Sequence, residues 1–534
     1  MPPQALIGYI QNEPKGGTIL KNLTYIQGAM VLSITNLVTG SLSFYFRIYF
    51  SKHVGAEGVG VYQLVLPLYM LAITLVSGGI TTALSKIIAE YHARRQMAAI
   101  GKTLKICFIA MTLWSVVLCT FVAFHAEFIA SFVLKDGRTS MSIIVLTPAV
   151  FFISISAIFR GYFYGIQEIG FPAGIDIIEK VIRLAGMILI TDRLMIYGIA
   201  FACAGAMAAM TAGELMSTLL LFLIYLWKKP RLSKQPSMSS LSIMKKMLGL
   251  AVPLSLGGAL STIMDMISAI LIPERLQLAG YNSAAALSGY GEITGMVMPL
   301  INYPGIVVFA LTTTLIPAIT QSHIGNNYGA LNKKCQDSLV IAWSIGLLTT
   351  VFCVSFPEEL CRTLFNRPEA GKLLFWTGLG SAFYYLYMIQ SAILNGLGLQ
   401  REVFNNIIFD LLINVACIYL LMPIPWIGIY GYVAGFFISG IVIVIRNIRI
   451  FNRLDYIRIR YDKVLLKPIL PFWVMFLTIK LINFLLLSMG FAYNMIFSGI
   501  IGIIALVISL LWNNVFTADQ IKKTLLLQKS YNSR

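Results

Sequence analysis

Long apolar runs dominate the chain, and short polar segments separate them. A helix needs about 20 mostly apolar residues to cross a bilayer. The runs are continuous rather than alternating, which favours membrane helices over the strands of a membrane barrel. The pattern predicts about fourteen spanning helices, at 23–46, 61–88, 104–126, 141–163, 172–190, 197–226, 247–271, 290–317, 337–356, 373–397, 403–421, 426–447, 464–488 and 492–514.

The composition agrees with that pattern. Of the 534 residues, 58% are hydrophobic and 12% are charged, and the mean hydropathy is +0.81. A soluble domain carries about 25% charged residues. The chain therefore has too few polar residues to cover a large water-soluble core, and we predict an all-α polytopic membrane protein.

The basic residues are spread unevenly between the polar segments. If the N-terminus is cytoplasmic, 27 of the 40 Lys and Arg residues fall in segments on the inner side and 9 on the outer side. Cytoplasmic segments of membrane proteins carry such an excess. We therefore expect both termini in the cytoplasm. The chain has no basic stripe with interleaved aromatics, so the net charge of +18 does not indicate nucleic acid as a partner.

Weak internal matches indicate a duplication. At an offset of 232, Pro67 aligns with Pro299, and at an offset of 233 the GIQ of 165–167 aligns with the GLQ of 398–400. Six helices per repeat is an even number, so both copies run in the same sense. This predicts two six-helix lobes related by a pseudo-two-fold axis along the membrane normal, with a cavity between them.

The duplication divides the chain into four predicted parts. The basic, proline-containing segment 228–246 has the composition of a linker between the lobes. Helices 13 and 14 have no counterpart in the repeat. The parts are an N-terminal lobe at 1–227, a cytoplasmic linker at 228–246, a C-terminal lobe at 247–450, and two extra helices with a cytoplasmic tail at 451–534.

Motifs for catalysis and for cofactors are absent from the sequence. It contains no P-loop and no H-E-x-x-H motif, its four histidines are dispersed, and its seven cysteines form no C-x-x-C pair. We expect no catalytic residue, no metal and no cofactor. The chain is predicted to be a transporter, driven by an ion gradient, the membrane potential or the substrate gradient.

Four charged residues lie close together within one apolar run. Asp176, Glu179, Lys180 and Arg183 are spaced i, i+3, i+4 and i+7, which puts them on one helix face. Pairs of opposite charge at i,i+4, Asp176 with Lys180 and Glu179 with Arg183, could neutralise that face. A charge at membrane depth costs about 2.5–3.5 kcal/mol. We favour a face turned toward a hydrated cavity over a purely structural one.

Two arginines lie near the ends of predicted spans. Arg47 follows the first span and Arg160 precedes the end of the fourth. Either side chain could reach the membrane interface along its own stem, as long basic side chains do. The alternative for both is a cation that lines the cavity and binds substrate.

Four isolated acids complete the candidate residues. Asp265, Glu214 and Asp410 lie inside predicted spans, and Glu292 opens another. Each could face the bundle interior or form a structural hydrogen bond, and at Glu292 the helix dipole favours an acid. Asp265 and Glu292 are cavity candidates. Glu214 and Asp410, together with Asp176, are candidates for ion coupling.

Three stretches resemble a known family. Residues 55–71, 159–183 and 288–322, the last containing TTTLIPAI, are similar to the stage V sporulation protein B family of the multidrug, oligosaccharidyl-lipid and polysaccharide exporter superfamily. The resemblance implies a flippase of the bacterial cell membrane that works by alternating access. The implied substrate is a polyprenyl-pyrophosphate-linked saccharide, such as lipid II for spore cortex or cell-wall peptidoglycan.

The resemblance also implies site residues and partners. The family's pattern maps onto Arg47, Arg160, Gln167, Glu179 and Arg183 as cavity residues. Cell-wall synthesis proteins are implied as partners besides the lipid-linked substrate and the bilayer. Three other functions stay open. They are an H⁺- or Na⁺-coupled exporter of cationic drugs, a non-transporting scaffold, and a membrane glycosyltransferase, which the lack of a large acidic loop disfavours.

Overall fold

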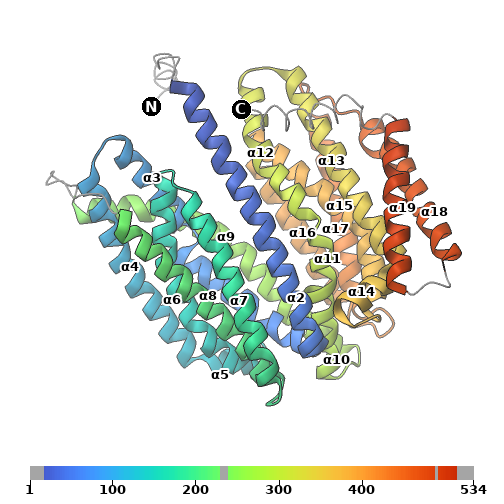
Figure 1. Cartoon of the computed structure of the whole chain (residues 1–534), viewed down its shortest axis with the longest axis horizontal. Coiled ribbons are helices and arrows are strands. Elements are labelled where there is room, and N and C mark those ends of the chain that lie inside the picture. Colours follow the sequence, from blue (N-terminus) through green and yellow to red (C-terminus); the bar gives the residue numbers. More distant parts are fainter. Residues whose placement is uncertain (1–16, 229–238, 487–490, 514–534) are drawn as a thin grey trace. The chain divides into compact units, whose positions relative to one another are not determined.

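The computed structural model describes residues 17–228, 239–486 and 491–513, and these residues form helices without any strand (Figure 1). The predicted all-α fold is confirmed. The first half contains α2 (Gly17–Ser77), α3 (Ile80–Ala93), α4 (Met97–Phe124), α5 (Ala126–Phe128), η1 (Ile129–Val133), η2 (Gly137–Thr139), α6 (Ser140–Gly165), α7 (Gly170–Met195) and α8 (Ile199–Lys228).

The second half continues the helical pattern. It contains α9 (Ser240–Leu278), α10 (Ser283–Gly291), η3 (Glu292–Val297), α11 (Met298–Asn302), α12 (Gly305–Ile324), α13 (Tyr328–Ser355), α14 (Pro357–Phe365), α15 (Ala370–Gly396), α16 (Gln400–Leu421), α17 (Tyr430–Asn452), η4 (Asp462–Leu466), α18 (Lys467–Leu485) and α19 (Phe491–Trp512). Most of the predicted linker 228–246 and both chain ends lie outside the described residues.

Among the described residues, ten segments are long and apolar enough to cross a membrane. One of them, Ile34–Ala93, contains two of the predicted spans. The helices α7, α9 and α15 are not among these ten segments. The chain is therefore a multi-pass membrane protein, and the count of fourteen stays a prediction.

Two predicted spans are interrupted, and local chemistry explains both breaks. The span 61–88 divides at Gly78–Gly79, where α2 ends and α3 begins. The span 290–317 divides at Tyr303–Pro304, because Pro304 has no N–H to donate to a helical carbonyl. The Tyr385 hydroxyl donates a hydrogen bond to the Ile301 carbonyl beside this break, so a polar group freed by the break is satisfied.

The long helix α2 turns sharply at Gly55, which has φ 74° and ψ 177°. A residue with a Cβ rarely adopts this conformation, and glycine does so without steric cost. The break in α2 is thus confined to a single residue, with helix on both sides.

Local structure recurs along the chain at a constant offset of 231 residues. Left-handed residues end helices at Arg95 and Asn326, at Lys135 and Asn366, and at Gln167 and Gly398. Side-chain contacts recur as well. The Cys119 thiol donates to the Thr147 carbonyl over 3.3 Å, and 231 residues later the Thr350 hydroxyl donates to the Gly378 carbonyl over 3.0 Å. The structural offset of 231 therefore differs by one or two residues from the offsets of 232 and 233 found in the sequence.

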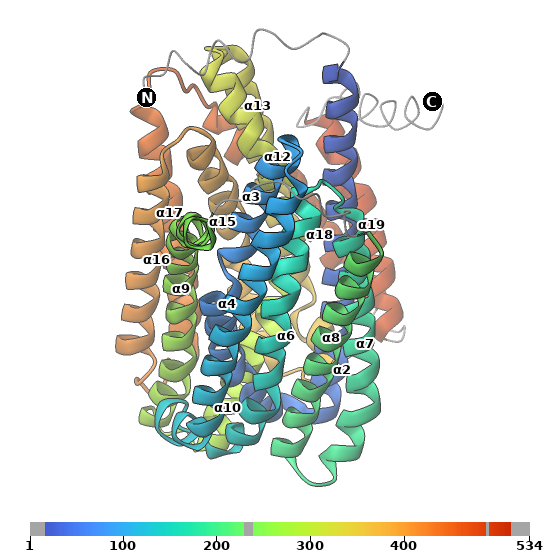
Figure 2. The same ribbon diagram turned by 90° about the vertical axis from the view of Figure 1, so that its left-hand side faces the viewer.

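Helix packing repeats at the same offset. A Cβ added to Gly165 would lie 2.8 Å from the Ile88 Cβ, and one added to Gly396 would lie 2.7 Å from the Ile319 Cβ. Gly165 thus lies where α6 packs against α3 (Figure 2), and its equivalent Gly396 lies where α15 packs against α12.

A reciprocal contact joins the two repeats. A Cβ on Gly291 would lie 2.1 Å from the Ala56 carbonyl oxygen, and a Cβ on Gly60 would lie 2.2 Å from the Leu287 carbonyl oxygen. Gly60 and Gly291 are equivalent residues of the two repeats, and so are Ala56 and Leu287, because each pair is 231 residues apart. Each contact is thus the other one with the two repeats exchanged, and such reciprocal contacts arise across a two-fold axis. The Gln63 side chain adds a 2.9 Å hydrogen bond to the Thr294 carbonyl.

The start of α9 packs on the first repeat. The Gly79 amide donates a 3.0 Å hydrogen bond to the Ser255 hydroxyl, and a Cβ on Gly79 would lie 2.1 Å from the Ala251 carbonyl oxygen. The Lys246 amine pairs with the Glu90 carboxylate. This part of α9 therefore packs on α3 and on the glycine that precedes it.

These contacts divide the chain into two compact units that differ from the predicted parts. The first unit is 1–46 with 65–265, and the second is 47–64 with 266–534. Segment 47–64 joins the second unit because Gly60 packs on α10, and 247–265 joins the first because it packs on Gly79. The predicted boundaries at 227 and 247 describe the repeats, not the compact units, and they stay a prediction.

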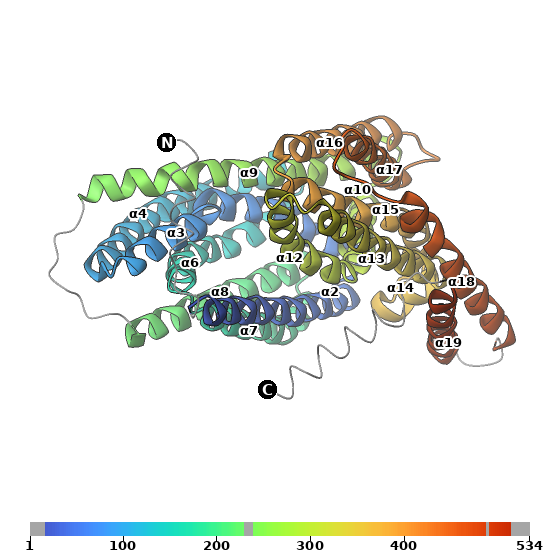
Figure 3. The same cartoon turned by 90° about the horizontal axis from the view of Figure 1, so that it is seen from above.

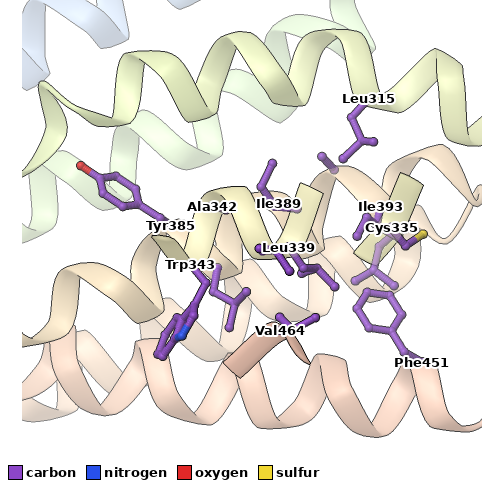
Figure 4. Packing of buried hydrophobic residues seen from close by; sticks show 14 of the residues in the cluster. Leu315, Cys335, Leu339, Ala342, Trp343, Tyr385, Ile389, Ile393, Phe451 and Val464 are labelled. Carbon is purple, nitrogen blue, oxygen red and sulfur yellow. The ribbon is translucent and has the colours of Figure 1, made fainter. Parts of the chain in front are cut away.

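The second unit has an apolar core around α13 and α15. Figure 4 shows side chains of α12, α13, α15, α17 and η4 converging there, among them Leu339, Ile389, Phe451 and Val464. The helices α18 and α19 lie side by side, and α18 also packs on α13 (Figure 3). They extend the second unit beyond the repeated helices.

Candidate functional site

Charged side chains meet where α6, α7 and α8 pack together in the first unit. We call this group the charged cluster. It consists of Arg160 on α6, Asp176, Glu179, Lys180 and Arg183 on α7, and Glu214 and Ser217 on α8.

Arg160 is the centre of the charged cluster. Its Nη2 atom lies 2.9 Å from Asp176 Oδ1 and 3.6 Å from Glu179 Oε2. The same nitrogen donates a 3.2 Å hydrogen bond to the Ser217 hydroxyl. One guanidinium from α6 therefore binds groups on both neighbouring helices.

One of the two expected i,i+4 pairs on α7, Asp176 with Lys180, is replaced by other contacts. Lys180 Nζ lies 2.6 Å from Glu179 Oε1, so it binds its neighbour rather than Asp176. The Arg183 guanidinium carbon lies 5.2 Å from the ring centre of Phe46 on α2, within range of a cation–π contact. Arg160 thus takes the place of Lys180 as the partner of Asp176.

Glu179 and Glu214 are the most deeply buried acids of the charged cluster, with exposed fractions of 3% and 5%. Glu214 Oε2 and Arg160 Nε have no hydrogen-bond partner among the described residues. A buried polar atom without a partner costs about 1–3 kcal/mol. The cluster therefore has acceptor and donor atoms that a ligand or a water molecule could satisfy.

Close helix packing explains why these side chains meet. A Cβ on Gly213 would lie 3.2 Å from the Glu179 carbonyl oxygen, so α8 lies directly against α7. The hydroxyls of Thr211 and Thr218 each donate a 2.9 Å hydrogen bond to α6, to the carbonyls of Val145 and Phe152. Small and hydroxyl-bearing residues are typical of tight membrane-helix interfaces.

The remaining predicted cavity residues lie outside these contacts. Gln167 is exposed at the left-handed turn after α6, and Asp265 is exposed on α9. Arg47 and Glu292 belong to the second unit, on α2 and at the start of η3. Their roles in binding stay predictions.

Asp410 is the second-repeat equivalent of Glu179. Its partner Asn414, which is equivalent to Arg183, donates a 2.8 Å hydrogen bond to Asp410 Oδ1 and a 3.2 Å hydrogen bond to the Ser439 hydroxyl. At the offset of 231, Arg160 and Lys180 correspond to Ser391 and Leu411. At these equivalent positions the second repeat thus keeps the acid and has neutral residues in place of the three cations.

Two contacts of the charged cluster were missed in the sequence. Ser217 is an ordinary polar residue there, and only its i+3 spacing from Glu214 placed it on the same face. Phe46 was part of the first apolar run, and nothing in its surroundings indicated a cation. No group of His, Cys, Asp and Glu side chains suited to a metal ion occurs in the described part of the chain.

Comparisons with known proteins agree with this fold. The chain is 29% identical over 431 residues to stage V sporulation protein B of Bacillus subtilis (strain 168), covering 79% of this chain and 82% of that one. It is 22% identical over 448 residues to the lipid II flippase MurJ of the same organism, covering 78% and 82%.

Solved structures share the fold at low identity. An inward closed conformation of the lipid II flippase MurJ gives a TM-score of 0.67 at 16% identity, covering 90% of this chain and 98% of that one. An inward-facing multidrug resistance MATE family transporter of the MOP superfamily gives 0.60 at 16%, covering 80% and 98%.

Two family descriptions match the sequence. MatE matches residues 253–420, and "polysaccharide biosynthesis protein" matches residues 25–323, which is more than half of the chain. The protein belongs to the polysaccharide biosynthesis protein family.

Proposed function

We propose that this protein is a flippase for a polyprenyl-diphosphate-linked saccharide of the lipid II type, in spore-cortex or cell-wall synthesis. The head group would cross between the two lobes by alternating access while the lipid tail stays in the bilayer. The protein would act as a transporter and not as an enzyme.

The observation that carries this proposal is the asymmetry of charge between the repeats. Arg160, Lys180 and Arg183 lie on α6 and α7, whereas the equivalent second-repeat residues are neutral. Guanidinium groups bind phosphate oxygens in a planar, two-pronged geometry. Cations held at membrane depth by buried acids form a site for a diphosphate. Its oxygen atoms can replace the carboxylates of Asp176 and Glu179 as the partners of Arg160.

The relatives support the same substrate class. Two of the similar proteins are named a sporulation protein and a lipid II flippase. We further propose a location in the bacterial cell membrane with both termini cytoplasmic, since the excess of Lys and Arg favours that orientation. Cell-wall synthesis proteins are the proposed partners.

The competing function is an H⁺- or Na⁺-coupled exporter of cationic compounds. The match to MatE over 253–420 supports it, and Asp410 with Ser439 supplies oxygen atoms on the second repeat. A coupling ion at Asp410, or a proton at Asp176 or Glu214, is compatible with either substrate. The three first-repeat cations favour the anionic one.

The proposal is tested by reconstituting the full chain in liposomes. We expect a fluorescent polyprenyl-diphosphate saccharide to cross the bilayer at a rate that depends on the protein, and a cationic dye to stay where it was loaded. The same assay with an imposed proton or Na⁺ gradient shows whether transport is coupled to either ion. Movement of the dye without movement of the lipid-linked saccharide would establish the competing function instead.

A further inference from the structure

The turn between α17 and α18 carries a dense row of cations outside the repeated helices. We call residues 449–467 the basic turn. Its basic residues are Arg449, Arg453, Arg458, Arg460, Lys463 and Lys467, and its acids are Asp455 and Asp462. The segment therefore has four more positive than negative charges over 19 residues.

Most of these cations are exposed and uncompensated. Arg460 pairs with Asp462 at 3.1 Å. The other five basic side chains make no ion pair with any residue in the described ranges, and only Lys463 among them is half-buried. The free positive charge of the basic turn thus faces outward, where a ligand can reach it.

The backbone beneath the cations is fixed. The Asn332 side chain on α13 donates a 3.1 Å hydrogen bond to the Tyr456 carbonyl and accepts one of 2.7 Å from the Arg458 amide. The Tyr456 ring lies 5.0 Å from the His323 ring, and Ile457 is 7% exposed. A pre-ordered surface loses less conformational entropy when it binds a ligand.

An apolar face begins where the basic turn ends. Leu466 at the end of η4 and Leu470 and Trp473 on α18 are 66%, 57% and 57% exposed, and their spacing of four and three residues places them on one side. In a bilayer an exposed apolar face of this kind contacts acyl chains, and tryptophan favours the level of the head groups. The cations therefore lie at the depth of lipid phosphates.

We propose that the basic turn binds the phosphodiester head groups of anionic glycerophospholipids, with their acyl chains along the exposed face formed by Leu466, Leu470 and Trp473. Charge complementarity selects this occupant, because clusters of Lys and Arg beside a membrane helix attract anionic lipids. The site lies outside the repeats and does not depend on the proposed transport. Bound lipid would hold α18 and α19 against the rest of the second unit, where α18 packs on α13.

Trp473 offers a direct reporter. The full chain is reconstituted in phosphatidylcholine vesicles that contain brominated phosphatidylglycerol or, in a parallel series, brominated phosphatidylcholine, and the Trp473→Phe variant gives the signal of the other six tryptophans. We expect brominated phosphatidylglycerol to quench the Trp473 emission at several-fold lower mole fraction. Raising the salt concentration should reduce this preference, since exposed charges are screened.

Matched charge variants complete the test. Arg453→Gln/Arg458→Gln/Lys467→Gln removes three exposed cations and should reduce the phosphatidylglycerol preference by roughly fivefold or more. Arg94→Gln/Arg95→Gln/Lys105→Gln removes three exposed cations of the first unit and should leave it unchanged. Equal quenching of wild type by both lipids, or an equal loss of preference in the two variants, would overturn the proposal.

Discussion

Replacing Arg160 with glutamine is expected to lower the free energy of unfolding by about 3–5 kcal/mol, the range for removing one partner of a buried ion pair. Arg160 binds Asp176 at 2.9 Å and Glu179 at 3.6 Å, and Glu179 is 3% exposed. The variant removes from both acids the cation that α6 supplies. Thermal unfolding of the purified protein measures the loss, and transport in liposomes should be abolished.

Two further variants separate folding from binding. Arg160→Gln/Asp176→Asn/Glu179→Gln removes the acids together with the cation and should recover most of the lost stability, while transport stays absent. Arg160→Lys keeps the charge but not the two-pronged geometry, so it should recover stability better than transport. A wild-type unfolding temperature for Arg160→Gln would show that the guanidinium is not the centre of the cluster.

Replacing Gly291 with alanine is expected to lower the stability of the second unit by about 3 kcal/mol, the upper part of the range for overpacked sites. The added Cβ would lie 2.1 Å from the Ala56 carbonyl oxygen and 2.6 Å from the Gly60 nitrogen. Both are backbone atoms, so no side chain can rotate to make room. The measurement is the unfolding temperature together with the yield of monodisperse protein.

Gly249 provides the control for this substitution. A Cβ at Gly249, on α9, would meet no atom within 4 Å. Because alanine favours helix over glycine by about 1 kcal/mol, Gly249→Ala should be neutral or slightly stabilising. If Gly291→Ala unfolds at the same temperature as Gly249→Ala, the reciprocal contact between the repeats does not have the close geometry described.

The helices follow from apolar runs alone, because a bilayer imposes a length on each spanning segment. The breaks within 61–88 and 290–317 were harder to predict. Glycine pairs and prolines also occur inside unbroken helices, as Pro148 does in α6. Whether such a residue ends a helix depends on a packing partner, such as Ala251 against Gly79, and the sequence does not contain that information.

The site was predicted in part for a similar reason. Spacing placed Asp176, Glu179, Lys180 and Arg183 on one face, and they do lie together. Spacing could not predict that Arg160, from another helix, would bind two of them, because a pattern within one helix leaves contacts between helices undetermined. The repeat was found at 232 and 233 rather than 231 because few side chains are shared. The turns and close contacts are retained far better than the residues.

The central claim is that first-repeat cations bind an anionic head group, and Arg183→Ala tests it most directly. The measurement is the initial rate at which a fluorescent polyprenyl-diphosphate saccharide crosses proteoliposomes, compared with Arg193→Ala, an exposed cation farther along α7. A charge-assisted hydrogen bond contributes about 1.5–3 kcal/mol, so Arg183→Ala should slow translocation by about tenfold or more while Arg193→Ala keeps the wild-type rate. Translocation by Arg183→Ala at the wild-type rate would contradict the claim.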